Sequence, residues 1–112
     1  MLKEGCGIQK VVLRMGKTDL RRGIDGLAAI VRLEAGMDPL EKGTLYLFCG
    51  NRTDRIRGLI YEDDGYLLLT KRLSGKNRFQ WPRKAEDMRQ ITMEQYRNLM
   101  EGFEIEGHIK ED

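Results

Sequence analysis

The sequence contains few of the residues that most catalytic and metal sites require. Its 112 residues include two cysteines, two prolines, one tryptophan and one histidine. Cys6 and Cys49 have neither CxxC spacing nor neighbouring histidines, so they do not form a zinc site within one chain. We expect both to be reduced thiols, as cytosolic cysteines usually are, although the sequence leaves a disulfide between them open. His108 lies near the acidic C-terminus and has no evident partners for a catalytic triad.

Motifs for nucleotides, catalysis and membranes are also missing. The closely spaced glycines match neither a P-loop nor a GxGxxG fingerprint. Asp63 and Asp64 precede Gly65 in an expected tight turn, which explains them better than a metal-dependent nuclease does. No apolar run reaches the roughly 20 residues that span a bilayer, and the first residues lack the apolar segment of a secretory signal. We therefore expect a cytoplasmic protein that is not an enzyme and has no metal, cofactor or small-molecule substrate.

The composition is that of a folded protein, with 40% hydrophobic and 34% charged residues. The length suits a single domain over residues 1–112. The net charge of +2 is unevenly spread, because residues 52–84 carry nine Lys/Arg and four Asp/Glu, whereas residues 85–112 carry three and eight. A basic centre and an acidic end are compatible with nucleic-acid binding, but also with ordinary solvated faces. Residues 103–112 are expected to form a flexible acidic tail.

Hydrophobic periodicity predicts an α+β fold. Residues 8–15 predict a first strand, and Thr18 and Asp19 supply N-cap chemistry for a helix at about residues 19–35, which Gly36 ends. Residues 44–50, 55–62 and 66–73 predict an antiparallel meander, with a short further strand at residues 78–81. Thr92 and Gln95 match a capping box for a second helix at about residues 92–101. The expected sheet has four to five strands, with the first helix packed on one face.

Alternation along the strands predicts two different faces. An Asp64-Gly65 turn would place Phe48 opposite Arg57, and Arg57 opposite Arg72. An aliphatic face would then lie under the first helix, and the other face would collect aromatic and basic side chains. Like charges directly opposite each other repel unless an anion lies between them, so this face predicts a nucleic-acid partner. The alternative is that the second helix covers the rings while glutamates pair the arginines.

Three ordered motifs resemble a known family. Residues 17–28 read KTDLRRGIDGLA, residues 47–57 read LFCGNRTDRIR, and KRL at 71–73 is followed by RFQWP at 78–82. These strings resemble the signatures of the TnpB-type accessory proteins of the insertion-sequence family numbered sixty-six, over roughly residues 10–102. Asn51, Gly58 and the Ile60-Tyr61 pair depart from that pattern. The resemblance implies a small companion of a separately encoded transposase, and not the RNA-guided nuclease that shares the TnpB label.

The candidate site residues follow from the predicted face and the motifs together. The cations expected to contact nucleic-acid phosphates, with DNA favoured and RNA as the alternative, are Arg55, Arg57, Lys71, Arg72 and Arg78. The rings expected to stack or pack are Tyr46, Phe48 and Trp81. The candidate partner contacts are Arg21, Arg22 and Asp25, although a structural role for Asp25 and Asp54, pairing Arg21 or Arg55, is the simpler interpretation. The alternative function is a protein-interaction module that binds the transposase without touching DNA.

Overall fold

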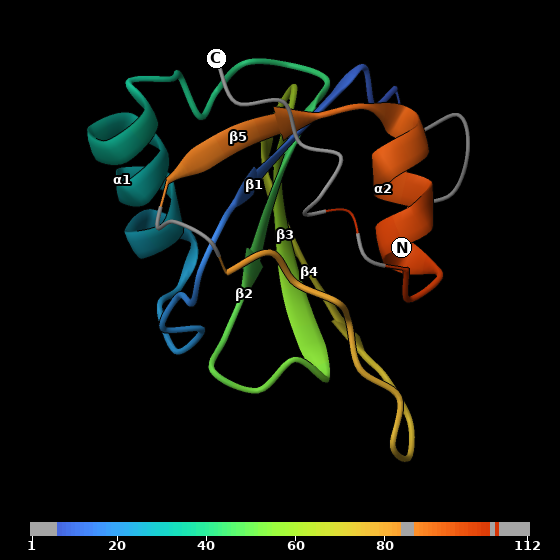
Figure 1. Cartoon of the computed structure of the whole chain (residues 1–112). Coiled ribbons are helices and arrows are strands. Elements are labelled where there is room, and N and C mark those ends of the chain that lie inside the picture. The colour runs from blue at the N-terminus through green and yellow to red at the C-terminus, as the bar shows by residue number, and fades with distance from the viewer. Residues whose placement is uncertain (1–6, 84–86, 104, 106–112) are drawn as a thin grey trace.

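A computed structural model describes residues 7–83, 87–103 and 105 of the chain as five strands and two helices (Figure 1). In chain order these are β1 (Lys10–Arg14), α1 (Ile24–Ala35), β2 (Thr44–Cys49), β3 (Arg55–Glu62), β4 (Gly65–Arg72), β5 (Met88–Ile91) and α2 (Met93–Met100). The predicted α+β class is confirmed. No helix within these ranges is long and apolar enough to cross a bilayer.

The strands form one mixed sheet in the order β4-β3-β2-β1-β5. The predicted meander of β2, β3 and β4 is confirmed, and β1 joins it by pairing parallel to β2, with α1 as the crossover. β5 then pairs antiparallel to β1 and forms the second edge. The sheet is therefore mostly antiparallel, with a single parallel pair between its first two strands in chain order.

The predicted strand at residues 78–81 is wrong. This segment is extended but joins no sheet: the Phe79 N–H donates to the Thr53 carbonyl, and Pro82 has no N–H for a ladder. Its apolar side chains point into the core, which is why its hydrophobicity resembled that of a strand. The fifth strand is β5, from a polar stretch in which Arg89 and Gln90 conceal the strand pattern.

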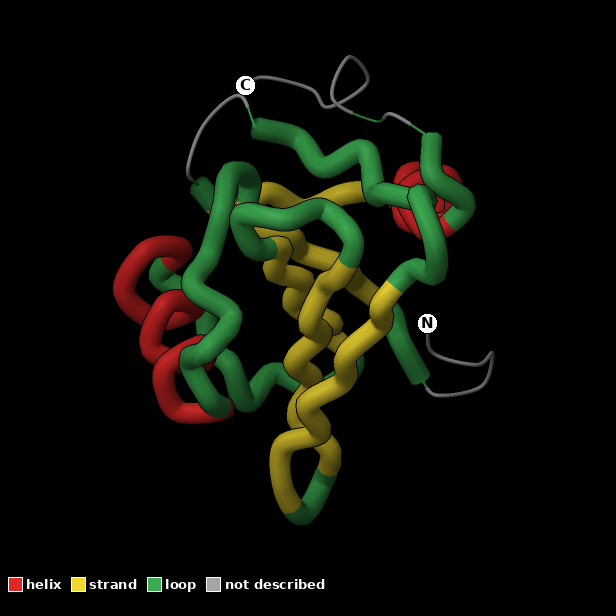
Figure 2. The backbone as a smooth tube through the Cα atoms, turned by 90° about the horizontal axis from the view of Figure 1, so that it is seen from below, coloured by secondary structure: helices red, strands yellow, loops and turns green. Residues whose placement is uncertain are grey.

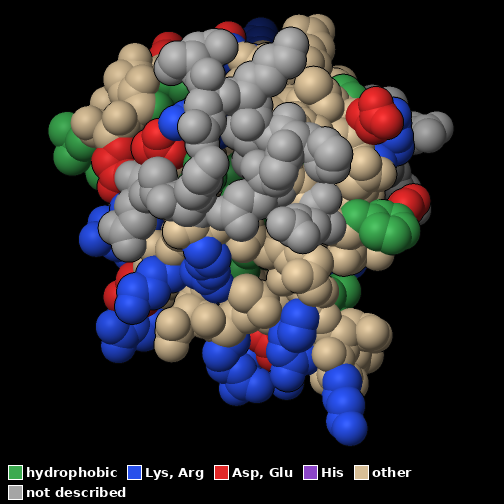
Figure 3. Space-filling model, in the orientation of Figure 1, with side chains coloured by type: hydrophobic (Ala, Val, Ile, Leu, Met, Phe, Trp, Pro, Cys, Tyr) green, Lys and Arg blue, Asp and Glu red, His purple; other side chains and the backbone are tan. Residues whose placement is uncertain are grey.

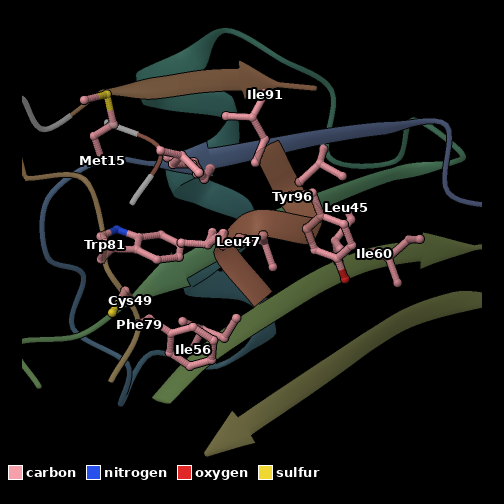
Figure 4. Packing of buried hydrophobic residues seen from close by; sticks show 14 residues of the cluster. Met15, Leu45, Leu47, Cys49, Ile56, Ile60, Phe79, Trp81, Ile91 and Tyr96 are labelled. Carbon is pink, nitrogen blue, oxygen red and sulfur yellow. The ribbon is translucent and has the colours of Figure 1, made fainter. Parts of the chain in front are cut away.

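Both faces of the sheet are buried, one beneath each helix (Figures 1 and 2). α1 packs on the face that presents Val12, Tyr46, Phe48 and Leu59. α2 covers the other face together with the 79–81 segment, and the buried residues there include Val11, Leu13, Leu45, Leu47, Ile56, Ile60, Phe79, Trp81, Tyr96 and Leu99 (Figure 4). The prediction that the first helix lies on the aliphatic face is thus wrong. Because all six residues of β2 are buried, alternation alone does not say which face receives which helix.

The start of α1 differs from the prediction, whereas the end of α1 and the start of α2 agree with it. α1 begins at Ile24 and not near residue 19, because Asp19 accepts hydrogen bonds from the backbone N–H and the guanidinium of Arg21 and so closes a separate turn. α1 ends as predicted, with Gly36 in the left-handed region at φ +62°. α2 has the predicted capping box between Thr92 and Gln95, with both hydrogen bonds present.

The predicted tail lies almost wholly outside the described residues, as do Cys6 and His108. Ile105 is an exception, since its side chain is 1% exposed and belongs to the core on the α2 side of the sheet. Cys49 is a free, fully buried thiol at the end of β2.

Candidate nucleic-acid interface

The three rings expected to stack on bases are part of the core. Tyr46 and Phe48 are fully buried beneath α1, and the Tyr46 hydroxyl donates to the Asp38 carbonyl at 3.0 Å. Trp81 is 5% exposed on the opposite face, where its indole N–H donates to the Arg14 carbonyl at 3.0 Å (Figure 4). Their faces already pack against protein, so Tyr46, Phe48 and Trp81 do not form a stacking surface.

The arginines of the meander share one side of the sheet, in a register that differs from the prediction. The β2–β3 pairing is as expected, with Phe48 opposite Arg57. The turn between β3 and β4 is Asp63-Asp64, however, so that Arg57 lies opposite Thr70 and Arg55 lies opposite Arg72. The slip is an even number of residues, and even slips preserve the face of each side chain. Arg55, Arg57 and Arg72 therefore lie on the side that carries α1.

A cleft of about 870 Å³ opens beside these arginines, between the β1–α1 connection and the β2–β3 connection. Seven Lys and Arg residues line it: Arg14, Lys17, Arg21, Arg22, Arg52, Arg55 and Arg57. Only two acidic residues do so, Asp19 and Glu34. Figure 3 shows Lys and Arg side chains gathered in the lower half of the molecule, where Figure 1 shows the β1–α1 and β2–β3 connections. The cleft is strongly cationic although the whole chain carries only +2.

Several of the cations already have a carboxylate. Arg14 contacts Glu34 at 2.8 Å through Nε, and Arg21 contacts Asp19 at 2.9 Å. The Arg21 hydrogen bonds lower the pKa of Asp19 to about 2, so this carboxylate stays ionised. Asp54, which is 4% exposed, lies 3.6 Å from Arg55, so this carboxylate is buried beside one of the cations of the cleft.

Other cations of the cleft have no carboxylate partner. Lys17, Arg22 and Arg57 form no ion pair with any described residue. Arg52 is 3.5 Å from Asp54, the carboxylate that Arg55 also approaches. The Arg57 Nε atom is buried and lacks a hydrogen-bond acceptor within the described part of the chain. An unsatisfied donor on a charged group is unfavourable, so nothing in the described structure compensates the Arg57 charge.

The remaining predicted site residues lie elsewhere. Lys71 is opposite Ile56 and points to the α2 side of the sheet, while Arg72 ends β4 at the sheet edge. Arg78 donates to the Gly75 and Asn77 carbonyls and so stabilises a turn. Asp25 is an exposed residue in the first turn of α1, where a negative charge stabilises the helix dipole.

The cleft thus joins two groups that the sequence kept apart. Arg55 and Arg57 were predicted to contact phosphate, and Arg21 and Arg22 to contact a partner, yet all four line one cavity. Lys17 and Arg52 were missed. Both lie inside the motifs at residues 17–28 and 47–57, and the spacing of those motifs around a strand-helix-strand unit was the signal that could have revealed them.

A hydrogen bond and a close contact fix the walls of the cleft relative to each other. The Thr18 N–H donates to the Cys49 carbonyl at 2.7 Å. A Cβ atom at Gly50 would lie 3.2 Å from the Leu20 side chain, so a larger residue there would push Leu20 away by a few tenths of an ångström. The cleft is thus a basic groove whose two walls are joined by this hydrogen bond. Within the described residues there is no cluster of three His, Cys, Asp or Glu side chains that would hold a metal ion.

Comparison with known proteins agrees with the motifs. The family model described as IS66 Orf2 like protein matches residues 9–110. An uncharacterized protein of Sinorhizobium fredii, y4jC, is 30% identical over 96 residues, which cover 85% of this chain and 80% of that protein. No solved structure matches. The chain therefore belongs to the IS66 Orf2-like family, which supports an accessory role in insertion-sequence transposition.

Proposed function

We propose that this protein assists transposition by binding nucleic acid through the phosphate backbone, in the basic cleft between the β1–α1 and β2–β3 connections. It acts as a binding protein in the cytoplasm, with the transposase carrying the chemistry. The observation that carries the proposal is the excess of seven cationic over two acidic side chains around one cavity. A concave surface lined with one sign of charge concentrates the electric field and attracts the opposite charge.

Arg57 favours phosphate over a simple counterion. Its guanidinium is partly buried and its Nε donor is unsatisfied within the described residues, whereas Arg55 beside it shares Asp54. A guanidinium presents parallel N–H donors that match two phosphate oxygens, and such charge-assisted pairs are among the strongest hydrogen bonds in proteins. A phosphate in the cleft would pair with the Arg57 charge without displacing an existing ion pair.

The burial of the rings shapes the kind of recognition that we propose. Phosphate contacts position a nucleic acid but carry no sequence information, which comes from base edges or from deformation. Because Tyr46, Phe48 and Trp81 are in the core, these rings are not available in the cleft to stack on bases. Binding by the isolated protein would therefore depend strongly on salt and weakly on sequence, with duplex DNA favoured over RNA in the context of transposition.

The second candidate is direct binding to the transposase. The same cleft would accept an acidic segment of a protein, since carboxylates pair with arginine as phosphates do. The exposed Leu33 of α1, with 84% of its side chain accessible, offers an apolar contact beside Glu34 of the cleft wall. An exposed leucine beside the cleft suits a protein partner better than it suits a phosphate backbone. Both candidates are therefore included in the same test.

The test is a fluorescence anisotropy titration of a labelled DNA duplex at several salt concentrations. Cationic contacts to several phosphates predict that affinity falls steeply with salt, by counterion release. No binding at low salt would refute the proposal. A pull-down of the tagged protein from cells that express the transposase, with and without nuclease, then separates the candidates: a DNA bridge is lost on digestion, and a direct protein interface survives.

A further inference from the structure

The outer edge of β4 is an unpaired strand edge. β4 is the terminal strand of the sheet and pairs only with β3, over all eight of its residues. The hydrogen bond from the Leu73 N–H to the Asp54 carbonyl, at 2.6 Å, continues this ladder beyond the strand. It also sets the phase of the ladder, because N–H and C=O groups alternate between the two sides of a strand. The backbone N–H and C=O groups of odd-numbered β4 residues point toward β3. Those of Tyr66, Leu68 and Thr70 therefore point outward, away from the sheet.

Nothing described occupies these outward groups. No backbone or side-chain hydrogen bond reaches the N–H or C=O of Tyr66, Leu68 or Thr70 from outside the sheet, among the residues that the structure describes. Soluble proteins usually protect such an edge with proline, a charge, a bulge or a very short strand. Residues 66–70 read Tyr-Leu-Leu-Leu-Thr in a regular, unbulged pairing with β3. From Gly65 to Thr70 this edge has no charge, proline or bulge, and the only charges on β4 are Lys71 and Arg72 at its end.

We propose that β4 is a dimer interface, where it pairs antiparallel with β4 of a second copy of this chain, with Leu68 opposite Leu68 of the second copy. Tyr66 then lies opposite Thr70, and all these residues exchange backbone hydrogen bonds, because their N–H and C=O groups are the outward ones. Leu67 and Leu69 face each other on the α2 side. The two sheets join into one continuous sheet.

Charge complementarity selects a second copy as the occupant. In this register Arg72 lies opposite Asp64 of the second copy, and the symmetry repeats the pair at the other end. Arg72 is exposed beside Arg55 and has no carboxylate partner among the described residues. Asp64 is likewise exposed and unpaired there, whereas its neighbour Asp63 already contacts Lys42. Opposite charges across paired strands stabilise the pairing. Two copies of β4 are thus complementary in charge when they pair antiparallel.

The symmetry has a consequence for the cleft. The two-fold axis of such a pairing runs perpendicular to the sheet, and this operation reverses the strand direction without exchanging the faces. Both copies of α1, and both basic clefts, then lie on the same side of the joined sheet. If the clefts bind phosphate as proposed above, the dimer presents two of them to one nucleic acid. Only this consequence rests on the proposed function; the pairing itself does not.

The first experiment measures the mass of the full chain by sedimentation, without nucleic acid, across a range of concentrations. We expect a concentration-dependent dimer of twice the 13.0 kDa chain. Arg72→Glu and Asp64→Lys each place like charges across both ends of the interface, and we expect each to raise the dimer dissociation constant by about tenfold or more. An equimolar mixture of the two variants restores opposite charges at both ends and is expected to recover the dimer. A chain that stays monomeric at the highest concentration overturns the proposal.

A cross-link tests the register directly. In a Cys6→Ser background, Leu68→Cys places two thiols across a hydrogen-bonded pair, about 5.5 Å apart at Cα, which is within reach of a disulfide. Thr70→Cys on the same edge is the matched control, since its symmetry mate is several residues further along the strand. We expect covalent dimer on oxidation of the first variant and not of the second. A dimer that ignores the charge variants and cross-links at neither residue overturns the assignment to β4.

Discussion

Arg57 lies directly opposite Phe48 on the neighbouring strand, on the same side of the sheet. The ring is fully buried beneath α1, while the guanidinium lines the basic cleft with a buried Nε that has no acceptor in the described structure. Of this cross-strand pair, Phe48 is part of the core and Arg57 is part of the candidate site. At Arg57, therefore, the cleft wall is part of the sheet and rests directly on the core beneath α1.

Reversing the charge at Arg57 should weaken nucleic-acid binding. We expect Arg57→Glu to reduce affinity for a DNA duplex by about tenfold or more at low salt, and to reduce the salt dependence by about one phosphate contact. The matched control is Lys71→Glu, which makes the same change of charge on the opposite side of the sheet and should lower affinity by no more than about threefold. Equal losses for the two variants, measured by anisotropy, would locate binding outside the cleft.

Truncating the buried rings should affect folding and not binding. We expect Phe48→Ala and Trp81→Ala each to lower the free energy of unfolding by about 3–5 kcal/mol, because each leaves a large cavity. Trp81→Phe keeps most of the volume but loses the indole hydrogen bond to the Arg14 carbonyl, and should have a smaller effect of about 1–2 kcal/mol. Urea denaturation measures all three. A ring variant that keeps wild-type stability but loses DNA affinity would show that the ring contacts nucleic acid.

The buried thiol predicts a loss of stability at alkaline pH. Desolvation on burial raises the pKa of Cys49 from 9.0 to about 11. The thiol of the unfolded chain therefore ionises first, and stability falls as the pH rises from about 9 to about 11. Cys49→Ala removes this contribution, so the decline in melting temperature over that interval should become shallower, whatever the change in absolute stability. The remaining slope includes Tyr46, whose pKa burial raises to about 12. An unchanged slope would contradict the prediction.

The capping box sets the stability of α2. Thr92→Ala removes the acceptor for the Gln95 N–H and should destabilise the protein by about 1 kcal/mol. Thr92→Ser retains the hydroxyl and serves as the control, with an expected loss of only a few tenths of that value. Thermal unfolding measures both. Equal melting temperatures for the two variants would mean that the hydroxyl contributes nothing to α2.

Local signals in the sequence predicted most of the elements. Glycine at position 36 and the Thr92/Gln95 pair mark helix ends through contacts within a few residues, and both are as expected. β5 was missed because its partner β1 lies more than seventy residues away in the chain, so that no short-range pattern reports the pairing of Val12 with Gln90. The formation of β5 thus depends on its tertiary pairing with β1.

The candidate site was predictable in charge and not in shape. Alternation correctly kept Arg55 and Arg57 on one side, because even a wrong turn assignment slipped the register by two residues. The same alternation placed Tyr46 and Phe48 beside them and could not show that α1 covers the rings but stops short of the arginines. That division depends on where α1 begins, which the Asp19–Arg21 turn shifts to Ile24.

The position of β1 between β2 and the edge strand β5 determines when the sheet can be completed. β1 is made first, yet one of its neighbours, β5, spans Met88–Ile91 near the other end of the chain. Such distant pairing gives the fold a high contact order, and folds of this kind form slowly. During synthesis one edge of the apolar strand β1 therefore stays unpaired until β5 has left the ribosome.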